Sequence, residues 1–522
     1  MSYKVLFVYP NLSMSAMVPH AIAALASVLK NDGFEASVFD ATRYESTTNS
    51  NKTRVKMFNA VPYNFKDRGI EAKESDVFYD FREKIESFKP DLIAISIVED
   101  TYALGAKLLE SVRDTNIPVV AGGVFCTYAT DKVLANQDID YAIRGEGEKA
   151  ILDLCRALRD KKSPYEVNNL SYRANGKIVS NPVNPLVNCD DIPFPDYSVF
   201  DEDALYRPMM GDIYRTVSIE LHRGCPYNCG YCNSAANNHY YKEKTGQIFF
   251  RKRSLKSFSE ELDHMVKNYD PEFIYFISDT FLLLSDAEFA EFCDIYSKYK
   301  IPFFANTRAE TVTEKRVKML EDINCARFNV GLEHGNEEFR RKVVGRQLSN
   351  EVILNAIKLV GESKISTVTN NIIGFPDETR DLIFDTINLN RPVEKYCDSV
   401  SCTIFSPYHG TSLRDRAIKS GYLDDNVVVD SACFFSSLLK MPNLSVEEID
   451  GLHRTFTMYV RMPLSEWPRI ERAEKLDDEG NKIYQEIRAE FQDKYLSKRT
   501  HKKIRKMEKS GNCTKEQQNG KG

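Results

Sequence analysis

The sequence predicts an α/β protein with two main units: a Rossmann-like, doubly wound unit at the N-terminus and then a partial (β/α)6 barrel of TIM type. Apolar strand-like segments alternate with helix-like segments through about residue 430, an order typical of parallel sheets. At 522 residues the chain is too long for one core. Its 42% hydrophobic and 28% charged residues exclude a mostly disordered protein.

The first unit is expected to span residues 1–185. Its strands are expected at Lys4–Tyr9, Ala36–Asp40, Leu92–Val98, Val119–Gly122 and Tyr141–Arg144, and its helices at His20–Lys30 and Gly105–Arg113. Ligands of such sheets bind at the carboxyl ends of the strands, which here are followed by loops 10–19, 99–102 and 122–128. The polar insertion Thr42–Ser87 is expected to be an irregular surface excursion or cap.

A proline-punctuated stretch, residues 186–212, is expected to link the two units. The barrel is expected over 213–430, with its active site at the carboxyl ends of the strands. Its strands are predicted at Thr216–Leu221, Phe273–Ser278, Phe303–Thr307, Arg327–Leu332, Thr369–Gly374 and Ser399–Phe405. A helical region should follow over 431–496. The Lys-rich tail, 497–522, is expected to be disordered.

Charge and hydropathy exclude several classes of protein. The net charge is −6 and the basic residues are spread along the chain, so we expect no nucleic-acid partner. The N-terminus lacks the pattern of a signal peptide, and no uncharged apolar run approaches 18 residues. We therefore expect no membrane partner and a cytoplasmic location. In that compartment the 12 cysteines do not indicate a disulfide framework.

Three of the cysteines form a cluster directly after the first barrel strand. Cys225, Cys229 and Cys232 have CxxxCxxC spacing in a loop at the carboxyl end of that strand. Three neighbouring thiolates indicate a soft metal centre, either zinc or an iron–sulfur cluster. Structural zinc needs a fourth ligand, and His239 does not lie at finger-like spacing. A four-iron cluster with three cysteines would leave one iron open to a chelating substrate or cofactor.

The triplet, with Tyr231 between its last two cysteines, resembles the signature of the radical S-adenosylmethionine (SAM) superfamily. Most of the chain resembles the branch of that superfamily with an N-terminal cobalamin-binding domain, on segments 251–254, 274–281, 306–310, 330–335, 371–379 and 459–463. The resemblance implies a [4Fe–4S] cluster on Cys225, Cys229 and Cys232. It also implies reductive cleavage of SAM to a 5′-deoxyadenosyl radical, with an electron donor such as flavodoxin or ferredoxin.

The same resemblance implies roles for five further residues. Tyr231 would offer backbone groups to adenine, and its ring could pack under the loop as well. Glu333 would contact the ribose or the methionyl amine, and Arg346 the methionyl carboxylate. The alternatives are that Glu333 only pairs with a nearby arginine and that Arg346 lies on a solvated helix. Asp279 and Arg308 end predicted strands and would face the pocket, or else form one buried pair.

Segments 120–124 and 140–148 resemble the last two strands of cobalamin domains. Gly122 and Gly123 would allow the backbone to approach the corrin, or would simply form tight turns. The DxHxxG ligand motif of cobalamin mutases is absent, and His20, at a predicted helix start, is the one histidine near the corresponding loop. The resemblance therefore implies cobalt without a histidine ligand.

We expect a cobalamin-dependent radical SAM methyltransferase that acts on an unactivated carbon or phosphorus of a small metabolite. One alternative is radical cyclisation or rearrangement without methyl transfer, and another is a non-catalytic iron–sulfur or corrin-binding protein. His222, Tyr408 and His409 are candidate proton-handling residues, or ordinary hydrogen-bonding residues of loop and core. Cys513 in the tail resembles the second cysteine that some methyltransferases use. The sequence does not indicate the substrate.

Overall fold

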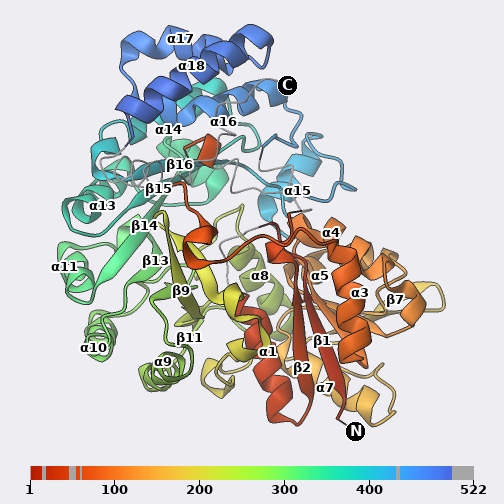
Figure 1. Cartoon of the computed structure of the whole chain (residues 1–522). Coiled ribbons are helices and arrows are strands. Elements are labelled where there is room, and N and C mark those ends of the chain that lie inside the picture. Colours follow the sequence, from red (N-terminus) through yellow and green to blue (C-terminus); the bar gives the residue numbers. More distant parts are fainter. Residues whose placement is uncertain (1, 14–18, 46–54, 59–60, 431–434, 497–522) are drawn as a thin grey trace.

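The computed structural model describes residues 2–13, 19–45, 55–58, 61–430 and 435–496 (Figure 1). Two sheets of seven strands organise this part of the chain, with a group of helices at its C-terminal end. Figure 1 shows α8 (Asn233–Thr245) lying between the barrel sheet and the N-terminal sheet. Among the described helices, none has the length and apolar character needed to span a bilayer.

The N-terminal sheet has the strand order β2-β1-β3-β4-β5-β6-β7. Strands β1 to β5 pair in parallel, and β6 and β7 continue the sheet as an antiparallel hairpin. The strands are β1 (Lys4–Tyr9), β2 (Glu35–Asp40), β3 (Leu92–Ser96), β4 (Val119–Gly122), β5 (Tyr141–Ile143), β6 (Leu170–Ala174) and β7 (Lys177–Ser180). This confirms a doubly wound unit, to which the hairpin adds strands that the sequence did not predict.

Alternation along β1 places a helical layer on each face of this sheet. Val5 and Phe7 join the core with α1 (His20–Asn31) and α7 (Glu148–Arg159). Leu6 and Val8 join the core on the opposite face, which contains residues of α3 (Val77–Phe88) and α4 (Glu99–Glu110). Successive side chains of a strand point to opposite faces, so an apolar run of this length is buried on both sides.

Two local predictions in this unit were wrong. The insertion Thr42–Ser87 is not wholly irregular, because it contains most of α3, whose first turn is capped by the Asp76 carboxylate accepting from the backbone of Phe78 and Tyr79. The helix predicted from residue 105 begins earlier, at Glu99. Acidic residues in a first turn are stabilised by the helix dipole, and α4 begins with Glu99 and Asp100.

The second sheet has the order β16-β15-β14-β13-β12-β9-β8 and forms the partial barrel. Its strands are β8 (Tyr206–Met209), β9 (Asp212–Ile219), β12 (Phe273–Phe276), β13 (Phe303–Arg308), β14 (Cys325–Glu333), β15 (Val368–Ile373) and β16 (Ser399–Ile404). Each predicted barrel strand is present, with ends that differ by a few residues. The antiparallel edge strand β8 lies in the stretch expected to be a linker.

Helices cover the outside of the barrel and its C-terminal end. The outer helices are α9 (Leu255–Tyr269), α10 (Asp286–Tyr296), α11 (Glu314–Asp322), α13 (Asn350–Glu362) and α14 (Arg380–Asn390). They are followed by α15 (Ser412–Lys419), α16 (Val446–Arg461), α17 (Trp467–Glu474) and α18 (Asp478–Lys494). Buried residues of α16 to α18 share a core with β15 and β16. The tail from 497, including Cys513, lies outside the described residues.

Candidate active site

The three clustered cysteines lie in a loop, residues 224–232, which we call the cysteine loop. It follows β10 (His222–Arg223) and ends at the start of α8. Gly224 has φ +81°, and a Cβ there would lie 2.6 Å from the Phe249 ring, so glycine is required. Gly230 donates to the Val344 carbonyl at 3.0 Å and accepts from the Leu413 amide at 3.0 Å. Distant segments of the barrel therefore fix the path of the loop.

The thiols of this loop are mostly buried: Cys225 and Cys229 are each 8% exposed. Burial raises the pKa of Cys225, and raises that of Cys232 to about 11. Cys225 and Cys232 must therefore lose a proton when metal binds. Among the described residues, no three His, Cys, Asp or Glu side chains converge as ligands of one ion do. A four-iron cluster differs in this respect, because its cysteines bind separate irons.

Arg308, at the end of β13, lies against the cysteine loop. Its Nη1 donates to the Cys229 sulfur at 3.2 Å, its guanidinium lies 3.7 Å from the centroid of the Tyr227 ring, and its Nε donates to Glu310 at 2.7 Å. Asp279 instead accepts a hydrogen bond from Ser234 in the first turn of α8. Arg308 and Asp279 therefore both lie close to the loop, and the alternative that they form one buried pair was wrong.

Glu333 and Arg346 form a buried ion pair of 2.8 Å, with Arg346 only 2% exposed. Glu333 ends β14 with φ +67°, an uncommon conformation for this residue type. Burial disfavours the charged form of Arg346, but the Glu333 carboxylate outweighs it and raises the pKa of the guanidinium. The solvated-helix alternative for Arg346 was wrong. The alternative that Glu333 pairs with a nearby arginine holds, and that arginine is the other predicted SAM contact.

Arg346 also supplies a test of whether an anionic cofactor fits here. Its Nε and Nη2 are buried and have no hydrogen-bond partner in the described part of the chain. Leaving buried donors unsatisfied costs free energy, and a planar guanidinium matches a carboxylate well. The residues therefore fit the methionyl carboxylate of SAM. Near this pair the Tyr231 ring is partly buried, with its centroid 6.0 Å from that of Phe375, so it packs under the loop as one interpretation predicted.

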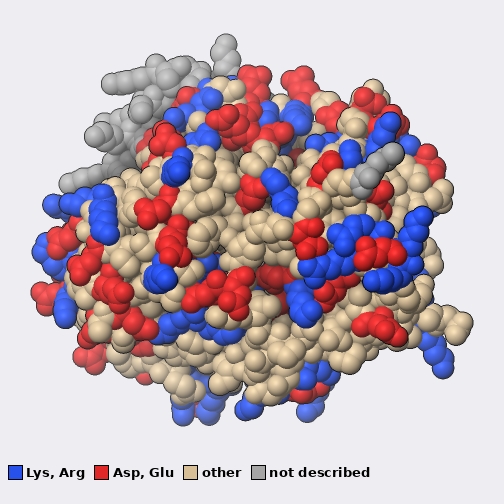
Figure 2. Space-filling model, turned by 90° about the horizontal axis from the view of Figure 1, so that it is seen from below, with Lys and Arg blue, Asp and Glu red and all other residues tan. Residues whose placement is uncertain are grey.

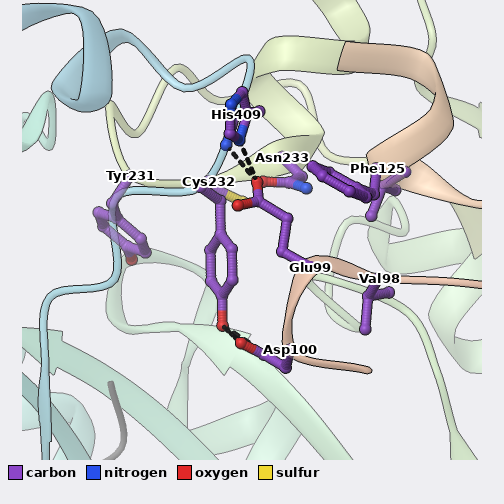
Figure 3. Close-up of a pocket in the computed structure, with 10 residues that line it drawn as sticks. Val98, Glu99, Asp100, Phe125, Tyr231, Cys232, Asn233 and His409 are labelled. Atoms are coloured by element: carbon purple, nitrogen blue, oxygen red, sulfur yellow. Dashed lines mark hydrogen bonds and ion pairs between the residues drawn. The ribbon is translucent and has the colours of Figure 1, made fainter. Parts of the chain in front are cut away.

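A cavity of about 370 Å³ lies between the N-terminal unit and the cysteine loop (Figure 3). One part of its wall follows β3 and β4, at the carboxyl ends of the strands, where a doubly wound sheet binds ligands. Another part belongs to the end of the cysteine loop. Its lining residues are Val98, Glu99, Asp100, Val124, Phe125, Tyr231, Cys232, Asn233, Tyr408 and His409.

Glu99 holds the two units together beside this cavity. Its carboxylate lies 2.8 Å from His409 Nδ1 and accepts from the His409 amide at 2.6 Å (Figure 3). It also accepts from the amide of Val429 at 3.0 Å. The neighbouring Asp100 accepts from the Tyr408 hydroxyl at 2.9 Å, and burial raises the pKa of Asp100 to about 7. His409 and Tyr408 thus act as hydrogen-bonding residues of the interface. The sequence placed loop 99–102 at the binding edge but did not single out Glu99 or Asp100.

Four candidates from the sequence analysis remain: His20, His222, Gly122 and Gly123. His20 Nδ1 lies 3.1 Å from the Tyr197 hydroxyl, and burial lowers the pKa of His20 to about 4. His222 is buried, with Nε2 3.3 Å from the Phe281 carbonyl, as a core residue would be. Gly123 has φ +109°, and a Cβ there would lie 2.3 Å from the Ile97 carbonyl oxygen, so it forms a tight turn. A Cβ on Gly122 would meet nothing within 4 Å.

Comparison with known proteins agrees with this geometry. The family model described as the radical SAM superfamily matches residues 219–389, and that of the B12 binding domain matches 15–154. The fold and the cysteine loop thus define an α/β enzyme in which a radical SAM barrel follows an N-terminal B12-binding domain. The protein is a cobalamin-dependent radical SAM enzyme, with a [4Fe–4S] cluster, SAM and cobalamin as its cofactors. The non-catalytic alternative was therefore wrong.

Curated relatives carry more than one activity in their names. An uncharacterized methyltransferase of Pyrococcus horikoshii is 29% identical over 361 residues, 67% of this chain and 74% of the relative. An anaerobic magnesium-protoporphyrin IX monomethyl ester cyclase of Rubrivivax gelatinosus is 25% identical, over 74% of this chain and 65% of the relative. Cytidylyl-2-hydroxyethylphosphonate methyltransferase of Streptomyces wedmorensis is 21% identical, over 84% of this chain and 85% of the relative.

Two solved structures share the fold along most of the chain. The methyltransferase TsrM from Kitasatospora setae, with cobalamin and a [4Fe–4S] cluster bound, has a TM-score of 0.60 at 16% identity, covering 80% of this chain and 78% of TsrM. The cobalamin-dependent radical enzyme OxsB, with aqua-cobalamin bound, has a TM-score of 0.63 at 16% identity, covering 94% of this chain and 71% of OxsB. At such identities these likenesses concern the fold alone.

Proposed function

We propose that the protein is a cobalamin-dependent methyltransferase acting on an unactivated carbon or phosphorus of a small metabolite. The observation that carries the proposal is the cavity of about 370 Å³, which is lined both by the strand ends of the B12-binding domain and by Tyr231 and Cys232 of the cysteine loop. Methyl transfer by way of a corrin needs both cofactors beside one space, because their reacting atoms must meet. Two of the three relatives described above are named methyltransferases.

In this proposal the chain holds its cofactors with the residues expected from the resemblance. Cys225, Cys229 and Cys232 would hold the cluster, and Tyr231 would offer backbone groups to adenine. Arg346 would bind the methionyl carboxylate with its unpartnered donors, and Glu333 the methionyl amine or ribose. When bound, the cluster supplies the electron that cleaves SAM, and the corrin carries the methyl group.

Further residues of the chain would orient these groups and shield them from water. Arg308 donates a hydrogen bond to the Cys229 sulfur at 3.2 Å and would so hold that ligand in place within the cysteine loop. Asp279 holds the first turn of α8 through Ser234. Gly122 leaves room for a close approach of the corrin to the backbone at the end of β4. The electron would come from a donor such as flavodoxin or ferredoxin, and the cytoplasm is the expected location.

Radical cyclisation or rearrangement is the second candidate. It is favoured by the likeness to the Rubrivivax gelatinosus cyclase, which extends over 74% of this chain. That reaction would use the same cysteine loop and the same Glu333–Arg346 pair. The two candidates differ in whether a methyl group leaves SAM for the corrin.

One experiment separates the candidates without knowledge of the substrate. The full chain is reconstituted anaerobically with iron, sulfide and hydroxocobalamin, reduced, and given SAM labelled with ¹³C in its methyl group. A methyltransferase should form ¹³C-methylcobalamin, detected by visible spectra and mass spectrometry. Deoxyadenosine without methylcobalamin would instead support cyclisation or rearrangement. A variant with all three loop cysteines replaced by Ala is the control for cluster-dependent cleavage.

A further inference from the structure

A buried group of charged side chains joins the B12-binding domain to the barrel immediately before the cysteine loop. We call it the interdomain ion cluster. Glu146 and Glu148 come from the B12-binding domain, after β5 and at the start of α7. The barrel side contributes Glu220 after β9, Arg223 of β10, and Arg251 of β11 (Arg251–Lys252). The cluster therefore contains three carboxylates and two guanidiniums.

Arg223 is the centre of this cluster. Its Nη1 donates across the domain boundary to Glu146 at 2.9 Å and to Glu148 at 2.8 Å. On its own side, Nη2 donates to Glu220 at 2.8 Å and Nε at 3.1 Å. Arg251 pairs with Glu146 as well. A single guanidinium thus binds carboxylates of both domains.

Because the interdomain ion cluster is buried, its hydrogen bonds tolerate little change in geometry. The five side chains are between 10% and 17% exposed. Charges that have lost most of their water must keep good hydrogen-bond geometry, because a displaced partner leaves an uncompensated buried charge. The exposed pair Arg68–Glu272, which joins the same two parts of the chain, carries no such constraint at 36% and 41% exposure.

The position of Arg223 in the chain connects the cluster to the chemistry. Only Gly224 separates it from Cys225, and Gly224 is locked by its positive φ against the Phe249 ring. Arg223 is paired with Arg251 in the antiparallel ribbon β10–β11, so both guanidiniums project from one small rigid unit. The B12-binding domain therefore contacts the chain two residues before the first cysteine.

A second contact acts on the far end of the same loop. Glu99 of the B12-binding domain holds His409, and the segment that follows reaches the loop through the Leu413 amide and the Gly230 carbonyl, 3.0 Å apart. The cysteine loop is thus tied to the B12-binding domain on both sides.

We propose that Arg223 is a positioning residue that fixes the cysteine loop, and with it the iron–sulfur cluster, relative to the B12-binding domain. The inference rests on the proposed function, in which the cluster and the corrin must act on one SAM-derived group. It assigns to the interdomain ion cluster the task of setting the separation between two cofactors, beyond holding two domains together.

Arg223→Lys is the informative variant. Lysine keeps the positive charge, but its ammonium is one point that cannot reproduce a planar fork shared among three carboxylates. The matched control is Arg68→Lys, which alters an ion pair between the same parts of the chain away from the cysteine loop. Glu148→Gln is a second test variant, which removes one partner of Arg223 and leaves the arginine in place.

The test measures the separation directly. Full-length protein is loaded with the cluster and hydroxocobalamin, and both are reduced to paramagnetic forms. Pulsed EPR then reports the dipolar interaction between cobalt(II) and the reduced cluster. We expect one narrow distance distribution in the wild type and in Arg68→Lys, and a broader or displaced one in Arg223→Lys and Glu148→Gln, at equal iron and corrin content. Methylation of cob(I)alamin by SAM should fall about tenfold or more in Arg223→Lys.

Two results would overturn the inference: a wild-type distribution in both Arg223→Lys and Glu148→Gln, or an equal change in the Arg68→Lys control. If Arg223→Lys does not fold, Glu148→Gln alone decides. The proposed function fails separately, because a wild-type protein that forms no methylcobalamin still gives a dipolar interaction to compare.

Discussion

Glu333 and Arg346 are bound to each other at 2.8 Å in the barrel, yet two nitrogens of Arg346 remain without a partner in the described residues. A pair whose only task was structural would satisfy more of the guanidinium, because buried unpaired donors are costly. The pair therefore has the character of a site prepared for a further anion. SAM carries such a group in its methionyl carboxylate.

Replacing Arg346 or Glu333 by Gln should weaken SAM binding about tenfold or more, equivalent to roughly 1.5–3 kcal/mol for a lost charge-assisted contact. Cluster content should not change, because neither residue is expected to bind iron. Equilibrium binding of SAM to the reconstituted protein measures the effect, with the exposed Arg341→Gln as control. Unaltered affinity in both variants would assign the pair a purely structural role.

The three loop cysteines should account for all of the cluster. Anaerobically reconstituted protein is expected to hold about four irons per chain. Replacing Cys225, Cys229 and Cys232 together with Ala should abolish the brown chromophore and SAM cleavage. Replacing the buried Cys293 of α10 should leave both intact. SAM cleavage retained in the triple variant would exclude these cysteines as the cluster ligands.

Gly122 and Gly123 should behave differently when replaced by Ala. At Gly123 the positive φ and the contact with the Ile97 carbonyl predict a loss of stability of about 1 kcal/mol or more. At Gly122 there is space for a methyl group, so stability should be unchanged and only the affinity for hydroxocobalamin should fall. Thermal unfolding and spectrophotometric titration measure the two effects. Wild-type corrin affinity in Gly122→Ala would remove Gly122 from the binding site.

His20 should not ligate cobalt. Its Nδ1 already interacts with the Tyr197 hydroxyl inside the core. This contact holds the imidazole ring in the core, so we do not expect it to bind cobalt. The EPR spectrum of bound cobinamide in the cobalt(II) state, which carries no nucleotide base of its own, should therefore show no nitrogen splitting. His20→Gln should give the same spectrum. Nitrogen splitting that disappears in His20→Gln would contradict this assignment.

His453 of α16 should make the C-terminal core sensitive to acid. Burial lowers the pKa of His453 from its ordinary 6.5 to about 4. The unfolded chain therefore binds the proton more readily, so this contribution to stability is complete above pH 6.5 and is lost as the pH falls towards 4. Between pH 7 and 5 the loss should be about 2 kcal/mol. His453→Gln should flatten that dependence.

The sole tryptophan of the chain, Trp467, reports on unfolding of the C-terminal core that contains His453. Its ring centroid lies 5.2 Å from that of Tyr459, on the same helix as His453. Urea unfolding followed by Trp467 fluorescence at the two pH values gives the free energies to compare. An equal loss with acid in wild type and His453→Gln would show that another group is responsible.

Much of the fold could be predicted because buried parallel strands are short apolar runs, and the six parallel strands of the barrel sheet were predicted from such runs. The antiparallel edge strand β8 was not. The hairpin β6–β7 could not be predicted, since β7 is exposed along its whole length and has no apolar pattern. Helix α3 could have been found: Asp76 is a good N-cap, and Val77, Phe81 and Ile85 repeat at helical spacing. It was not predicted because the whole insertion Thr42–Ser87 was interpreted as irregular from its polar residues.

Local spacing alone predicted only the cysteines of the candidate site, and Glu333 and Arg346 were added by the family resemblance. The three cysteines lie within eight residues and form a recognisable motif, whereas Glu333 and Arg346 are 13 positions apart and are brought together by the tertiary fold. The contacts of Glu99 with His409 and of Arg223 with Glu146 join residues far apart in the sequence. No periodicity in one chain encodes such pairs.

Gly331 lies beneath the Glu333–Arg346 pair, where a Cβ would come within 2.3 Å of the Glu333 carboxylate and 3.0 Å of Arg346 Nη1. Its backbone φ is not positive, so conformation alone would permit other residues. The restriction comes instead from the ion pair above it. In a saturation library selected for SAM cleavage, position 331 should therefore accept glycine alone, and a library selected only for folding should tolerate alanine there whenever the pair is also removed.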